Sequence, residues 1–290
     1  MKPLLLTAAC VATVAGLSRP PAAPVRGRDD ALLLPRAELL RPLAAPWPGL
    51  VADYFWLLEC NQLGRATTPQ EHRDVAAYAE LATDLDPRLY AAYKFGAVGS
   101  VFNLGREQFM NVDVSTHLLE KGLRQFPRDV PLRFLLGYNL GILKNDAQAA
   151  AAIFESLSRE PGAPPHLGPL ATRLYAEAGQ FDASAAMARA LRDAAPDTES
   201  RAFYERRLQE ISAERVLQQV DAAIDRYTSR TGAPPPDIQA LVAAGDLAAP
   251  PVDPLGGDVI LGPSGRARST ESTYRLRAIR PFLKSHGLQP

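Results

Sequence analysis

The sequence predicts an all-α protein, built as an array of antiparallel helix pairs and completed by a small mixed α+β segment. Apolar residues recur at helical spacing through most of the chain. The 26 prolines must separate many short elements. Similar helix endings, each with a proline, recur at intervals of 40, 34 and 35 residues, at Pro87, Pro127, Pro161 and Pro196.

The N-terminal segment carries features of an export signal. Residues 1–18 join a basic start at Lys2 to an apolar run of about 15 residues, shorter than the ~20 that span a bilayer. We expect a signal peptide or a retained membrane anchor. Acylation at Cys10 and an ordinary buried helix remain alternatives. Residues 19–30 are rich in proline and charge, which predicts an extended linker.

The apolar stretch at residues 50–66 predicts a helix of the folded core. Asp53 and Glu59 interrupt it, and a charge at mid-bilayer costs roughly 2.5–3.5 kcal/mol. The run is also too long for a typical strand, and Gly64 marks its end. A second helix follows, with Thr68 and Glu71 as a capping box and Pro69 at its first position.

Two helical patterns lie between successive proline endings. A short break separates the two helices of each pair, and the break within the first pair is longer than the others. Such helix pairs cannot bury both faces alone, so each needs neighbours. The first helices are expected at residues 90–104, 130–144 and 166–178, and the second helices at 115–126, 147–159 and 182–194.

A period near 34 with proline-closed helix pairs resembles the tetratricopeptide repeat. Leu136 and Gly137 fit the pair of the first helix, and Ala149 and Ile153 fit the second. The resemblance implies an α-solenoid over residues 31–197. One repeat later the same second-helix positions hold Ala183, Met187 and Ala190. The sequence departs from the pattern at Ser115, Leu119 and Gly122, and at the tryptophan position, which holds Tyr93, Arg133 and Leu167.

The C-terminal third changes character. Residues 198–230 predict one long capping helix for the array. Residues 231–290 predict a small segment with a short helix at 238–244, capped by Asp237, and a hairpin at the turn GPSG. The segment resembles the C-terminal part of type II secretion pseudopilins at Pro251, Asp253, Pro254 and Gly256.

No catalytic or cofactor motif stands out, so we expect no enzyme, no cofactor and no metal. The four histidines show no metal-ligand spacing. Asp253 and Asp258 flank a glycine turn that has too few oxygens for calcium. The charge is balanced, with 32 basic and 32 acidic residues, which gives no reason to expect nucleic acid. A local excess of basic residues after 258 indicates either a solvated tail or an acidic partner.

The resemblance implies a groove lined by the first helix of each repeat. From their positions within the repeat, we expect five residues to line this groove and bind the partner: Lys94, Phe134, Tyr138, Thr172 and Tyr175. For Phe134 and Tyr138, packing inward is an equal alternative. With the export signal, this implies a scaffold on the periplasmic side of the bacterial inner membrane. It would bind another protein or peptide, in pilus, secretion or export machinery assembly, with no small-molecule substrate. A pilus or secretion subunit acting through the C-terminal segment, and an enzyme, are the alternatives.

Overall fold

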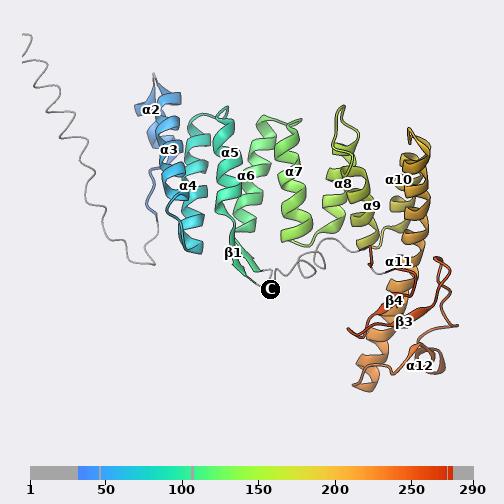
Figure 1. The fold of residues 1–290 in the computed structure, drawn as a ribbon. Helices are drawn as coiled ribbons and strands as arrows, with labels where there is room; N and C mark the ends of the chain where they lie inside the picture. The colour runs from blue at the N-terminus through green and yellow to red at the C-terminus, as the bar shows by residue number, and fades with distance from the viewer. Residues whose placement is uncertain (1–31, 46, 106–107, 273, 277–290) are drawn as a thin grey trace, which may run out of the picture.

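The structure, a computed structural model, describes residues 32–45, 47–105, 108–272 and 274–276. The predicted export signal with Cys10 and the linker lie outside the described residues. Consecutive helices stand side by side in a row, each packed against the next along the chain (Figure 1). Two small antiparallel strand pairs complete the described part, and the prediction of an all-α fold with a small α+β addition is confirmed at this level.

The row begins with α2, a short helix that the sequence did not reveal. Its helices are α2 (Ala37–Ala44), α3 (Pro48–Leu63), α4 (Pro69–Leu85), α5 (Tyr90–Ser100), α6 (Val112–Gln125), α7 (Val130–Tyr138), the π-helix η1 (Asn139–Leu143), α8 (Ala147–Ser158), α9 (Leu167–Glu177), α10 (Phe181–Asp193) and α11 (Thr198–Thr231). The remaining elements are β1 (Phe102–Gly105), β2 (Gln108–Met110), α12 (Ile238–Ala243), β3 (Val259–Leu261) and β4 (Ala267–Ser269).

The first long helices follow the prediction. The apolar stretch forms α3, with Asp53 exposed and Glu59 buried. The capping box at the start of α4 is present: the Glu71 amide donates to Thr68 Oγ1 at 3.2 Å, and the Thr68 amide donates to Glu71 Oε2 at 3.0 Å. These bonds satisfy two of the amide groups that a helix start leaves unpaired.

The expected helix at 90–104 is too long. Helix α5 ends at Ser100, and the chain then forms the β1–β2 hairpin, with Phe102 opposite Met110. Val101 is already extended, and Gly105 turns the chain at a φ of 82°. The aromatic and β-branched residues after Ser100 favour strand over helix. This hairpin accounts for the 40-residue interval between the first two proline endings.

The expected register of the second repeat helix is wrong by one residue. In α8 the buried residues at these positions are Ala150 and Phe154, whereas Ala149 and Ile153 are only half-buried. The cause is η1, because a π-turn accommodates one more residue than an α-turn and shifts everything after it. In α10 the buried residues are Ser184, Met187 and Ala188, so Met187 is buried while Ala183 and Ala190 are exposed.

The C-terminal segment packs on the second half of α11 (Figure 1). Leu217, Val220 and Ile224 of α11 share a core with Leu241 of α12 and Ala267 of β4. The short helix is capped as expected, with the Asp237 carboxylate accepting the Ala240 amide at 2.8 Å. Four of the six buried residues of this core belong to α11, so the helix that precedes the segment supplies most of its buried surface.

Candidate functional site

Helices α5 and α7 each present large apolar side chains that are exposed. Phe95 and Val98 are 49% and 56% exposed on one face of α5, and Tyr138 is 40% exposed at the end of α7. Ala92, Tyr93 and Gly96 occupy the opposite, buried face of α5. We call Phe95, Val98 and Tyr138, which lie on the first helices of two successive helix pairs, the α5–α7 face.

A buried polar network holds this face in position. The Ser115 hydroxyl of α6 donates to the Ala97 carbonyl of α5 at 2.7 Å, and it accepts the Asn139 side-chain amide at 2.8 Å. All three groups are buried. Hydrogen bonds in such surroundings fix geometry, because breaking one leaves an unpaired buried group. Asn139 begins η1 and directly follows Tyr138, so the network ties the π-turn and the tyrosine to α5.

The predicted groove residues do not gather on one open surface. Thr172 is fully buried, and its hydroxyl donates to the Pro169 carbonyl at 2.8 Å. Phe134 is half-buried, and its ring packs edge-on against Phe154 at 5.6 Å between centroids. Lys94 is half-buried on α5. Of the five, Tyr138 alone is exposed, so the inward alternative holds for Phe134 and not for Tyr138.

Tyr175 has an internal role instead of the expected partner contact. It is 8% exposed, and its hydroxyl donates to Glu155 Oε2 of α8 at 2.5 Å. Burial first, and then the hydrogen bond to the Glu155 carboxylate and its charge, raise the pKa of Tyr175 to about 12. The tyrosine therefore links α8 to α9 and offers little surface to a ligand.

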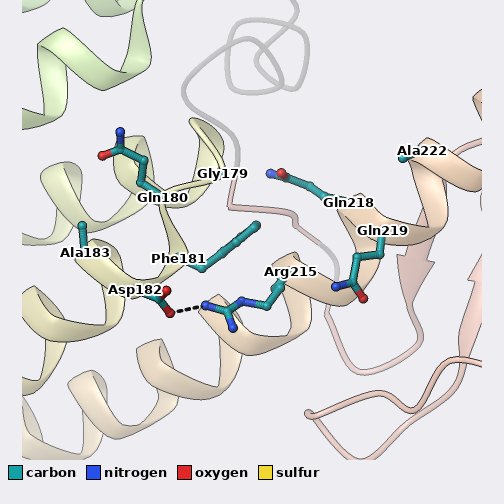
Figure 2. A pocket seen from close by; sticks show the side chains of 9 residues that line it. All are labelled: Gly179, Gln180, Phe181, Asp182, Ala183, Arg215, Gln218, Gln219 and Ala222. Carbon is teal, nitrogen blue, oxygen red and sulfur yellow. Dashed lines mark hydrogen bonds and ion pairs between the residues drawn. The ribbon is translucent and has the colours of Figure 1, made fainter.

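A hollow of about 610 Å³ lies between the start of α10 and the middle of α11 (Figure 2). Arg215 spans one side, donating to Asp182 at 2.5 Å and lying over the Phe181 ring at 5.2 Å. The Gln218 amide donates to the Ala176 carbonyl at 3.0 Å. The acidic side chain of this hollow is almost fully solvated, so it lacks the converging, water-excluded titratable groups that acid–base catalysis requires.

One buried carboxyl group has no evident structural partner. Glu59 is fully buried on α3, and neither of its carboxyl oxygens is hydrogen-bonded to a described residue. Burial raises the pKa of Glu59 to about 9. It lies where four helices meet: a Cβ atom added to Gly96 would stand 3.3 Å from Glu59 Oε1 and 2.4 Å from Ala79 Cβ. The group is therefore a neutral acid at pH 7 within the first core of the row.

The turn at residues 253–258 is a structural feature. Asp253 Oδ1 accepts the Leu255 amide at 3.0 Å, and Oδ2 accepts the Ser269 hydroxyl at 2.6 Å. One carboxylate oxygen thus shapes the turn itself, and the other holds the turn to β4. Within the described residues, no three His, Cys, Asp or Glu side chains group as metal ligands.

The basic excess of the C-terminal segment is partly neutralised by α11. Arg266 pairs with Asp225 at 2.7 Å. Arg275 pairs with Glu214 at 2.7 Å and also with Asp221. The remaining basic residues after 276 lie outside the described residues. Arg266 and Arg275 therefore fasten the segment to its own helix.

No protein-family model, no curated protein and no solved structure matches the chain. Within the described ranges, no helix has both the length and the apolarity to cross a membrane. Sequence reasoning missed Phe95 and Val98, although their spacing of three and the alanines and glycines on the other side of the helix signalled an apolar second face.

Proposed function

We propose that the chain is a non-catalytic scaffold that binds another protein or peptide through the α5–α7 face. The observation that carries this is the exposure of Phe95, Val98 and Tyr138 on helices whose opposite faces are buried. Aromatic and aliphatic side chains held on a rigid frame are the usual anchors of protein interfaces. A helix or an extended peptide laid across α5 and α7 would cover them.

The row of paired helices supports a solenoid of the tetratricopeptide type. Gly137 leaves room for the ring of Phe154, since a Cβ there would stand 2.9 Å from its Cζ. Close approach at a small residue of the first helix is what that repeat requires. The π-turn and the β1–β2 hairpin are departures from a regular repeat, and both adjoin the α5–α7 face. Departures of this kind often mark functional positions.

The export signal that the sequence predicts supports the proposal that this scaffold lies on the periplasmic side of a bacterial inner membrane, exported or anchored there. Assembly of a pilus, secretion or export machine is the role we propose, because such machines need non-catalytic proteins to hold their subunits. The proposal rests on the sequence resemblance for the compartment and on the exposed face for the mode of binding.

A crosslinking pull-down from membranes tests the binding function. The double variant Phe95→Ser/Val98→Ser removes the face, and Phe203→Ser/Val252→Ser removes two exposed apolar side chains elsewhere as a matched control. We expect a specific partner that the wild type and the control retain and the face variant loses. A partner retained equally by all three, or none with any, would overturn the proposal.

A further inference from the structure

The outer side of α3 carries a stripe of exposed apolar residues. Leu50, Tyr54 and Leu57 are each more than half exposed, and so is Trp47, the residue that caps the helix. Their spacing of three, four and three residues places them along one line of the helix. Ala52, Phe55 and Glu59, on the other side of the helix, are buried. We call Trp47, Leu50, Tyr54 and Leu57 the α3 stripe.

The helices near the two ends of the row, α3 and α11, differ in the polarity of their exposed side chains. The exposed positions in the first half of α11 are mostly charged or polar, among them Glu199, Arg201, Glu205 and Arg206. A terminal helix with a polar outer face is stable in contact with water. A terminal helix with an apolar outer face tends to bind another protein or a second copy of the array. The contrast within one molecule indicates that the α3 end is covered in the working protein.

The chemistry of the stripe favours a helix as the covering element over a lipid surface. Helix α3 contains no lysine or arginine, and its exposed side includes Asp53. A helix that lies on a membrane carries a broad apolar face with basic residues beside it. The α3 stripe is narrow, and it continues at Asn61, one heptad after Tyr54. A seam of alternating three- and four-residue steps with one polar member is typical of paired helices.

A second copy of the chain fits this seam. The four residues of the stripe are uncharged, and Asp53, beside Tyr54, is the one acidic side chain on the exposed side of α3. Together with Leu39 and Leu43 of the adjoining α2, the side chains of the stripe offer roughly 800 Å² of accessible surface, about what one partner contributes to a stable interface. A two-fold axis brings the same patch of both copies together, which closes the assembly.

We propose that α3 forms a symmetric dimer interface, in which the stripe of one copy packs against the stripe of another. The dimer joins two rows end to end and leaves the α5–α7 face of each copy open. This inference is independent of the partner-binding function, because it concerns a different helix side and a different occupant.

The mass of the full-length chain in mild detergent, measured by light scattering, tests the proposal. The wild type is expected at twice the chain mass of 31.4 kDa, and Leu50→Glu/Leu57→Glu at that mass alone. Phe95→Glu/Val98→Glu, the matched control on α5, is expected to remain dimeric. Circular dichroism establishes that each variant keeps its helices.

A disulfide crosslink gives a second readout that does not depend on destabilising charges. With Cys10 and Cys60 replaced by serine, Tyr54→Cys is expected to form a covalent dimer on mild oxidation, and Phe203→Cys to form no covalent dimer. A monomeric wild type, or a dimer unchanged by the α3 variant, would overturn the proposal. A monomer that binds neutral lipid vesicles through Trp47 would overturn it in favour of a membrane surface.

Discussion

Replacing the buried acid Glu59 by its neutral amide makes the protein more stable at neutral pH. Glu59 is fully buried without a described hydrogen-bond partner, and burial raises its pKa from 4.5 to about 9. The unfolded chain ionises this group above pH 4.5, whereas the folded chain keeps it protonated. The folded state thus binds one more proton between these values, and stability falls as the pH rises from 4.5 towards 9.

The magnitude follows from the size of the pKa difference. Each pH unit in this window costs about 1.4 kcal/mol, which amounts to about 3 kcal/mol at pH 7 relative to pH 4.5. Glu59→Gln removes this dependence because the amide does not titrate. The variant should therefore match the wild type within about 1 kcal/mol at pH 4.5 and exceed it by about 3 kcal/mol at pH 7.

Urea unfolding followed by tryptophan fluorescence measures this difference. Trp47 caps α3, the helix that carries Glu59, and Trp56 lies within it. The fluorescence of these two tryptophans therefore reports on the unfolding of the first part of the row. Asp53→Asn, an exposed carboxyl of the same helix, is the control, and it should change stability by under about 0.5 kcal/mol. A gain for Glu59→Gln that is the same at pH 5 and pH 8 would refute the reasoning.

Two further substitutions test the packing of the row and the fastening of its C-terminal segment. Gly96→Ala should destabilise the protein by about 1–3 kcal/mol, because the new methyl group would stand 2.4 Å from Ala79 Cβ and 2.7 Å from Leu118 Cδ2. Thermal unfolding measures it, with Gly64→Ala, whose site has room, as the neutral control. Arg275→Ala should cost about 3–5 kcal/mol, because it leaves Glu214 and Asp221 buried without their shared cation. Limited proteolysis after α11 should then accelerate, and adding Glu214→Gln should restore part of the resistance; unchanged cleavage rates would contradict the fastening role.

The helices were predictable from sequence where local signals agreed. The capping box at Thr68 and Glu71, the cap at Asp237 and the helical spacing of α11 all lie within a few residues of the features they determine. Features that depend on partners far along the chain were not. Asn139 forms a π-turn beside Ser115, 24 residues away, and no local pattern announces that pairing.

In the candidate site, too, the exposure of a side chain could not be predicted where it depends on neighbouring helices. Repeat position selected Thr172 and Tyr175, but the structure buries both, because α9 is packed against α8 on one side and α10 on the other. Tyr138 is exposed, which is one of the two alternatives that the sequence left open for it. Phe95 was missed because the repeat pattern points to its neighbour Lys94, and the side of a helix that faces outward depends on how α4 and α6 pack around it.

Site-specific photocrosslinking in the native host is the most direct test of the scaffold function. A photoreactive phenylalanine analogue at position 98, on the α5–α7 face, is compared with the same analogue at position 252, which is exposed on the C-terminal segment. The scaffold account predicts a discrete crosslinked protein at position 98 that is absent at position 252. Crosslinks at position 252 alone would contradict it and move the binding function to the C-terminal segment.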